Sequence, residues 1–435
     1  MKKLLDIKIL VFRKQAMVFK MRFFLILIFL FNIFGFSQHM HDNPAMPRGV
    51  FVETHMSREK EGKLLYISFR VSNNTLVFRK AGEGFSGEYS VSAEVSDSSG
   101  RVLVRESIIK EVFAATFEES NSTKFFSQGV MRMSFPFEKS RAIIKFNDLN
   151  TKREFILPVQ NWDSVSDEFL KPVVVTESPD GFELVNFGGR ILFTSNKQTI
   201  LFPLDDTSKS MLQIKIRERK NPDDDDTKTL MTKTEEFMDG SLVFEENNGK
   251  IKTALHEGKK RYFILRDFTQ KLNEGFLLFE IETGGLDKSA KYLLPVYWHN
   301  KPLSANNEDI IMQSLAAVEE ANVLEELSTG NKEERERKLN DYWEKIDPTP
   351  GTRFNELQEE FYLRVDHAIR NFSSLSKFNG HLTDRGKIFI RYGTPSEVIR
   401  GVDKFGRITE SWFYKEIYKE FIFTDRTGTN NFQLL

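Results

Sequence analysis

The sequence has no cysteine among its 435 residues, and this absence excludes several kinds of chemistry. Without thiols the chain forms no disulfide, no thiolate metal site and no cysteine nucleophile, and it lacks the residue that carries a lipoprotein anchor. Charge of one sign is also lacking, because 62 basic residues are balanced by 63 acidic ones. A net charge of -1 gives no field that would gather phosphates, so we expect no nucleic-acid partner.

Common catalytic motifs are absent as well. The sequence contains no G-x-S-x-G elbow, no H-E-x-x-H and no G-x-x-x-x-G-K-[ST] loop. Gly82, Gly84 and Gly87 have the spacing G-x-G-x-x-G, but an alternating segment follows them, whereas a dinucleotide site requires a helix there. We interpret these glycines as a hairpin loop. The four aspartates at 223–226 lack the alternation and the glycine of a calcium loop, which favours a solvated hairpin tip. We predict no metal and no cofactor.

Long hydrophobic runs are also missing, apart from residues 23–36. This run is shorter than the roughly twenty residues that a membrane-spanning helix needs. Arg22 precedes it, and Gly35 and Ser37 occupy the small-residue positions of a signal-peptidase site. We therefore predict that residues 1–37 are a secretory signal, with an uncleaved anchor as the alternative. The protein would then be exported to the periplasm or the cell surface and would meet the membrane only through this transient segment.

Two long regions consist of short segments in which apolar and polar residues alternate, separated by turn residues. This pattern is typical of antiparallel sheets. The regions cover residues 48–162 and 170–300, and we predict a β-sandwich domain for each. The 41 phenylalanines of the chain are expected to fill these cores.

Helical spacing begins after the second β region. Residues 303–350 are predicted to form a helical linker that ends where Pro348, Pro350 and Gly351 break the chain. Residues 351–435 are predicted to form a small α+β domain. In it a helix over 353–372 would cover an antiparallel sheet of about four strands, placed at 387–392, 411–414, 420–424 and 431–434.

The stretch 383–398 is the most specialised part of this domain. Ile388, Ile390 and Tyr392 alternate with polar or opposite-facing residues, which predicts a half-buried strand over 387–392. Thr394 and Glu397 have the spacing of a capping box with a proline between them. This second pattern predicts one helical turn that ends at Gly401.

Residues 379–398, N-G-H-L-T-D-R-G-K-I-F-I-R-Y-G-T-P-S-E-V, resemble the GWxTD domain, a bacterial family named for Gly-Trp-x-Thr-Asp. Gly380, Thr383 and Asp384 match the name motif, and His381 stands where the family has tryptophan. The similarity extends from about residue 347 to residue 428. The family has no established activity, so the resemblance implies a C-terminal architecture and an envelope location but no mechanism.

The polar residues of this stretch form a candidate site. A positioned histidine and carboxylate are the usual pair for proton transfer, and arginine suits an anionic group. The candidate binding cluster consists of His381, Thr383, Asp384, Arg385, Arg391, Tyr392 and Trp412. In the alternative, structural interpretation Asp384 caps a turn, while the two arginines bind helix carboxylates such as Glu356 or Glu360.

Two functions of different class remain. We favour a non-enzymatic binding or scaffolding protein of the cell envelope, which meets an envelope protein or peptide through strand edges and through Trp412, Phe413 and Tyr414. The alternative is a hydrolase of envelope polymer or peptide, with His381 and Asp384 as its catalytic groups.

Overall fold

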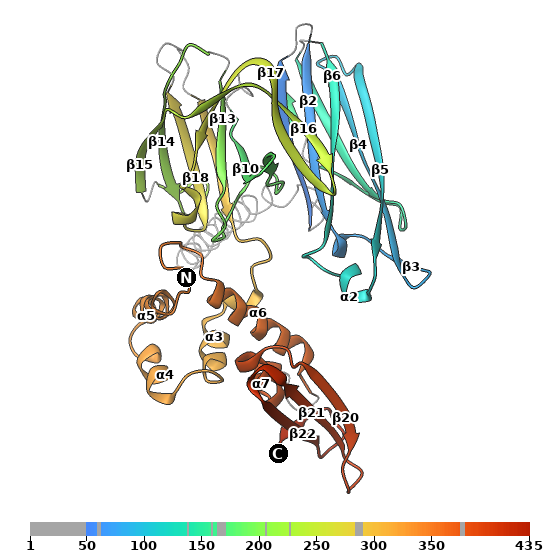
Figure 1. Ribbon diagram of the computed structural model, residues 1–435, viewed down its shortest axis with the longest axis vertical. Helices are drawn as coiled ribbons and strands as arrows, with labels where there is room; N and C mark the ends of the chain where they lie inside the picture. Colours follow the sequence, from blue (N-terminus) through green and yellow to red (C-terminus); the bar gives the residue numbers. More distant parts are fainter. Residues whose placement is uncertain are drawn as a thin grey trace, which may run out of the picture. The chain divides into compact units, whose positions relative to one another are not determined.

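The computed structural model describes residues 49–58, 62–136, 139–157, 160–162, 171–204, 207–225, 228–282, 290–374 and 379–435 (Figure 1). The predicted secretory segment lies outside this range. The chain divides into two compact units: the first contains the described residues up to Lys171 together with Leu242–Thr253, and the second contains Pro172–Ser241 and Ala254–Leu435. Across the described residues, no helix is both long and apolar enough to cross a membrane.

The first unit consists mainly of two antiparallel sheets, as the period-2 pattern predicted. One sheet has the order β1-β2-β6, and in the other β4 pairs with β3, β5 and β7, while β7 also pairs with β8 and β9. A single buried cluster includes Ile67 and Phe69 of the first sheet and Val91 and Phe146 of the second. The strands are β1 (Val50–Arg58), β2 (Lys63–Ser72), β3 (Arg79–Ala81), β4 (Gly84–Asp97), β5 (Val102–Ala114), β6 (Phe126–Phe135), β7 (Ser140–Asp148), β8 (Arg153–Ile156) and β9 (Gln160–Trp162).

The glycine-rich segment of this unit is a hairpin, as expected. Gly82 has φ 58 in the turn between β3 and β4, and a strand rather than a helix follows Gly84. The short helix α2 (Phe117–Ser120) was not anticipated. The tip of a hairpin, Leu242–Thr253, completes the unit: Phe244 stacks on His55 with ring centroids 4.6 Å apart, and Glu246 pairs with Lys110 at 2.5 Å.

The second unit begins with two further sheets. Their strand orders are β11-β10-β13-β17-β16 and β12-β19-β18-β14-β15. Asp223 to Asp225 lie in the turn between the paired strands β14 and β15, as predicted, and Asp226 lies outside the described residues. The strands are β10 (Val173–Ser178), β11 (Gly181–Leu184), β12 (Ile191–Leu192), β13 (Thr199–Leu204), β14 (Leu212–Arg219), β15 (Lys228–Thr234), β16 (Phe237–Asn247), β17 (Lys250–Leu265), β18 (Gly275–Glu282) and β19 (Ala290–Tyr297).

Helices follow in the C-terminal half, in the region predicted for them. They are α3 (Glu308–Leu315), α4 (Ala321–Ser328), α5 (Lys332–Lys345) and α6 (Glu356–Asn371). Asparagine caps three of them: the side chains of Asn307, Asn331 and Asn355 each accept a hydrogen bond from the backbone of the first turn. Trp343 of α5 packs with Phe361 and Val365 of α6 in a shared core.

The last part of the chain is a helix on a four-stranded antiparallel sheet, β20-β21-β22-β23. The helix is α7 (Asp384–Tyr392), and the strands are β20 (Glu397–Val402), β21 (Ile408–Tyr414), β22 (Lys419–Asp425) and β23 (Phe432–Leu434). Phe389 of α7 packs with Trp412 and Phe423 in the core between helix and sheet. The α+β class and the number of strands agree with expectation.

Two local predictions in this region were wrong. Residues 387–392 are the end of α7 and not a strand, and the segment 397–402 is a strand and not a helical turn. The alternation of apolar residues suggested a strand because α7 is buried on two sides. Ile388 and Phe389 face the sheet, whereas Ile390 packs in the core formed by the helices. The prediction that the helix over 353–372 covers the sheet was also wrong: α7 lies on the sheet, joined by Phe372 from the end of α6.

Candidate functional site

The start of α7 is built on two glycines that allow backbone segments to touch. Side-chain Cβ atoms essentially never lie closer than 3.0 Å to another heavy atom. A Cβ atom on Gly380 would lie much closer than this to the carbonyl oxygen of Ala368 in α6. A Cβ atom on Gly386 would meet the carbonyl oxygen of Gly380 equally closely. Thr383 ties the same segments together, because its hydroxyl donates to Gly380 O at 2.7 Å and accepts from the Gly386 N–H at 3.1 Å. These three residues hold α7 against α6.

Asp384, the proposed catalytic carboxylate, closes one edge of the sheet. Its Oδ2 accepts a hydrogen bond from the backbone N–H of Leu434 at 2.9 Å. This N–H belongs to β23, the last strand of the sheet, so the carboxylate covers an edge donor that would otherwise be open. Asp384 therefore has a structural partner, but it does not cap a turn as the alternative interpretation expected; Thr383 caps α7 instead.

Arg385 is buried in an ion pair with Glu410 of β21. Its Nη1 lies 3.2 Å from Glu410 Oε2, its Nη2 donates to Asn430 Oδ1 at 3.1 Å, and its guanidinium lies 4.0 Å from the ring centre of Phe432. Burial lowers the pKa of Arg385, and the nearby carboxylate of Glu410 opposes this shift. The expected partners were wrong: Glu360 pairs with Arg364, and Glu356 accepts a hydrogen bond from Thr349.

The other candidate residues lie apart in different contacts. His381 is buried, its Nε2 lies 3.2 Å from Gln313 Oε1, and its Nδ1 has no hydrogen-bond partner among the described residues. The hydroxyl of Tyr392 accepts a hydrogen bond from Lys419, and Arg391 is exposed. Trp412 is buried and donates to Glu410 Oε2 at 3.3 Å. Arg385 and Trp412 thus share Glu410 as a partner, whereas none of these contacts joins His381 to Asp384.

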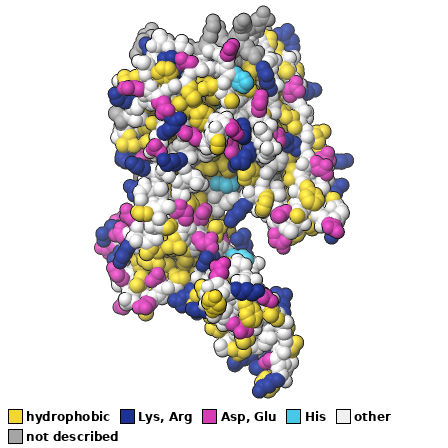
Figure 2. All heavy atoms as spheres, in the orientation of Figure 1, with side chains coloured by type: hydrophobic (Ala, Val, Ile, Leu, Met, Phe, Trp, Pro, Cys, Tyr) yellow, Lys and Arg dark blue, Asp and Glu magenta, His cyan; other side chains and the backbone are white. Residues whose placement is uncertain are grey.

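The edge strand β20, on the opposite side of the sheet from β23, was not predicted from the sequence. β20 pairs with β21 only, and all six of its residues are exposed. Val398, Ile399 and Val402 are 45%, 51% and 67% exposed. Within the described ranges no strand pairs with the outer side of β20, which forms the free margin of the sheet in Figure 1. Figure 2 shows hydrophobic and charged side chains interspersed over this C-terminal part of the molecule.

The comparison with protein families agrees with this part of the structure. Residues 283–434 match the model of the GWxTD domain. The C-terminal region of the chain is a GWxTD domain. No curated protein matches the chain. Among solved structures, the crystal structure of an ICAM-5 D1–D4 ectodomain fragment is similar, with 9% identity, a TM-score of 0.14 and coverage of 59% of this chain. The chain spans 55% of the length of that fragment.

The structure gives physical roles to the motif residues of this GWxTD domain. Gly380 allows the close approach to α6, Thr383 is the N-cap of α7, and Asp384 binds the backbone of β23. The position held by tryptophan in the family name is occupied by His381, which is buried against Gln313. Each of these roles supports the packing of α7, and none requires a substrate.

Burial makes the stability of the GWxTD domain depend on pH. It lowers the pKa of His381, and burial together with Arg370 lowers the pKa of His367. The unfolded imidazoles keep an ordinary pKa near 6.5, so below that pH the unfolded chain binds more protons and the folded state loses stability. We expect the free energy of unfolding to fall from about pH 7.5 to about pH 5.5, and to fall less in His381→Asn.

Hydrogen exchange of the amides in α7 and in β20 to β23, corrected for the intrinsic exchange rate at each pH, measures this dependence for the GWxTD domain alone. The same substitution at His256, an exposed residue, is the matched control and should leave the slope unchanged. Parallel pH profiles for the original chain and His381→Asn would contradict a buried neutral imidazole at this position.

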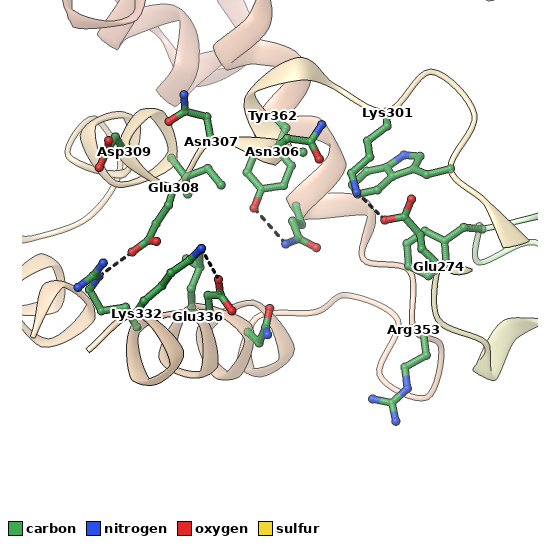
Figure 3. Close-up of a pocket in the computed structure, with 18 residues that line it drawn as sticks. Glu274, Lys301, Asn306, Asn307, Glu308, Asp309, Lys332, Glu336, Arg353 and Tyr362 are labelled. Carbon is green, nitrogen blue, oxygen red and sulfur yellow. Dashed lines mark hydrogen bonds and ion pairs between the residues drawn. The ribbon is translucent and has the colours of Figure 1, made fainter. Parts of the chain in front are cut away.

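A hollow of about 740 Å³ lies beside α3 and α5 (Figure 3). Three ion pairs line it: Lys301 with Glu274 at 2.6 Å, Arg335 with Glu308 at 2.6 Å, and Lys332 with Glu336 at 3.8 Å. Because these charges neutralise one another, the hollow offers no concentrated charge to a ligand. Within the described ranges no group of three or more histidine, aspartate and glutamate side chains could hold a metal ion.

Proposed function

We propose that the protein is an exported, non-enzymatic binding or scaffolding protein of the cell envelope, whose GWxTD domain accepts an extended segment of an envelope protein or peptide. The observation that carries this proposal is the bare edge of β20, at the opposite side of the sheet from the edge that Asp384 closes. A free strand edge is a template for a further strand, and many domains bind peptides in this way.

The register of β20 against β21 defines which backbone N–H and C=O groups are available to a partner strand. Asp403 N–H donates to Arg407 O at the turn, and hydrogen-bonded pairs alternate with non-bonded pairs along an antiparallel ladder. Ile399 and Gly401 therefore bond to β21, whereas Val398, Arg400 and Val402 direct their N–H and C=O groups outward. A partner strand would bind these outward groups and cover the exposed apolar side chains.

The location of the protein and the role of its β regions are part of the same proposal. Residues 22–37 have the pattern of a secretory signal, which supports export to the periplasm or the cell surface. The core that both sheets of the first unit share supports a β-sandwich there, and we propose the same arrangement for the second β region. Two such modules would serve as spacers that carry the GWxTD domain outward.

The alternative of a hydrolase has less support. Its proposed carboxylate, Asp384, is bound to the backbone of β23, and its proposed anion-binding group, Arg385, is buried against Glu410. Trp412 and Tyr414, which were expected to contact a partner, are buried in the core; Tyr414 donates to Gly393 O at 2.9 Å. The predicted contact through these two aromatic side chains was therefore wrong, and the strand edge remains as the binding surface.

A proline at Val398 tests the proposal, because it removes one outward N–H while the edge position tolerates the ring. We expect Val398→Pro to weaken partner binding about tenfold, through one lost interstrand hydrogen bond and a steric clash with the added strand. The measurement is capture of envelope proteins from extract by the intact chain and by the variant.

Val398→Thr is the matched control, since threonine keeps both the β-branched shape and the N–H. Partners retained by the original chain and by Val398→Thr, but lost with folded Val398→Pro, support the proposal. Equal capture by all three proteins, or no specific capture by any, contradicts it.

A further inference from the structure

An exposed positively charged side chain, Arg400, lies in the middle of the β20 edge. Glu410 is shared by two arginines: its Oε2 lies 3.2 Å from Arg385 Nη1, and its Oε1 lies 2.9 Å from Arg400 Nε. Asp425 is a second acidic residue that acts electrostatically on Arg385. Arg385 and Glu410 are buried, whereas the side chain of Arg400 is 77% exposed. The guanidinium of Arg400 is therefore presented at the surface.

Arg400 also has hydrogen-bonding capacity to spare. Its Nε is bound to Glu410, and no partner of its two terminal nitrogens is found among the described residues. A guanidinium group has five N–H donors, and a carboxylate can bind two of them side by side. The surface around it is apolar, because Val398 and Val402 lie two positions before and after Arg400 on the same face of β20.

We propose that the segment bound along β20 carries an acidic residue opposite Arg400, with an apolar residue two positions away on each side, opposite Val398 and Val402. The inference rests on the proposed function, in which β20 accepts a strand, and it adds the class of sequence that fits. Side chains directly opposite each other on paired antiparallel strands are about 5 Å apart at Cβ, so opposite charges there attract and apolar side chains pack.

A second copy of the same chain fits this edge less well. If two β20 strands paired about a two-fold axis with Val398 opposite Val402, then Arg400 would lie opposite its own copy. Like charges directly opposite each other destabilise a sheet, and a central charge is a known means of preventing edges from pairing with themselves. The same charge attracts a carboxylate, so the edge favours an acidic segment of another protein.

Selection from a random peptide library is the test of this preference. The library displays segments of about seven residues, long enough to span β20, and is selected on the intact chain with Val398→Pro as the counter-selection. We expect the retained peptides to contain aspartate or glutamate flanked at a spacing of two by valine, isoleucine, leucine or phenylalanine. The affinity of one retained peptide is then compared with that of its amide counterpart, asparagine or glutamine.

Substitution of Arg400 assigns the preference to this side chain. We expect the acidic peptide to bind about two- to fivefold more tightly than the amide peptide, with a smaller difference at high salt. Arg400→Gln should abolish the difference. Lys404→Gln is the matched control, because it removes an exposed positive charge from the neighbouring turn and should preserve most of the difference.

The outcomes separate this inference from the proposed function. Peptides that bind the intact chain but not Val398→Pro, without any preference for an acidic centre, would overturn the inference and leave strand addition in place. Peptides that prefer an acidic centre equally in Arg400→Gln would also overturn it. Failure to retain any peptide that depends on Val398 would overturn both.

Discussion

Replacing Gly386 with alanine is expected to destabilise the GWxTD domain by about 3 kcal/mol, although alanine is the better helix former. Gly386 lies in the first turn of α7, where helix propensity alone predicts a gain of roughly 1 kcal/mol. The added Cβ would come much closer than 3.0 Å to the carbonyl oxygen of Gly380. The Cβ is fixed to the helix backbone and the carbonyl oxygen is itself a backbone atom, so the first turn of α7 must move away from Gly380–Leu382 to make room. The sign of the effect therefore distinguishes close packing from propensity.

Hydrogen exchange of the amides in α7 and in β20 to β23 measures this loss, because the chain has several parts that need not unfold together. Gly401→Ala is the matched control: its Cβ would meet only Thr409 Oγ1, at an ordinary 3.4 Å. Gly380→Ala should resemble Gly386→Ala, since its Cβ would meet the carbonyl oxygen of Ala368. Equal protection in Gly386→Ala and Gly401→Ala would show that the glycine contact does not hold α7.

Strand patterns were readable from the sequence wherever one face of a strand is buried. In β4 and β7 buried residues recur at a spacing of two, and both strands lie in a region predicted to form antiparallel sheet. β15 has little apolar alternation, because it is an edge strand of threonine and lysine, K-T-L-M-T-K-T. Edge strands pack on few neighbours, so their sequences carry a weaker pattern.

The error at α7 has a different physical origin. A helix that packs on a sheet and on another helix is apolar on two faces, and over nine residues this pattern resembles alternation. The signals that bound the helix lie at the ends of the segment. The hydroxyl of Thr383 caps the helix by accepting a hydrogen bond from Gly386 N–H, and Gly393, at φ 77, ends the helix. These signals are equally compatible with turns that bound a strand, so they did not distinguish the two structures.

The contacts of the candidate site could be predicted only in part, because they join residues that lie far apart in the sequence. The expectation that Asp384 caps a turn was wrong: Thr383 is the cap, and the carboxylate of Asp384 binds a backbone N–H that lies 50 residues further along the chain. The partner of Arg385 is Glu410, 25 residues away and on a different element. Only the alternation of Glu410 with Trp412 and Tyr414 in β21 hinted that this carboxylate points inward. Long-range pairs of this kind depend on the sheet register, which one sequence does not give.

Glu410→Gln is the second substitution for which we expect a large effect, a destabilisation of about 3 to 5 kcal/mol. The amide can still accept a hydrogen bond from Trp412, but the buried guanidinium of Arg385 loses its ion-pair partner. An unpaired buried charge is costly, because the solvation lost on folding is no longer offset.

Arg400→Gln is the control, because Arg400 binds the same carboxylate. The side chain of Arg400 is 77% exposed, and its loss should cost about 1 kcal/mol or less. Combining Glu410→Gln with Arg385→Met should recover part of the loss, since the guanidinium that lost its partner is then removed as well. Hydrogen exchange in β21 and α7 measures all three variants, and similar effects of Glu410→Gln and Arg400→Gln would mean that the Arg385 pair is not the one that stabilises the domain.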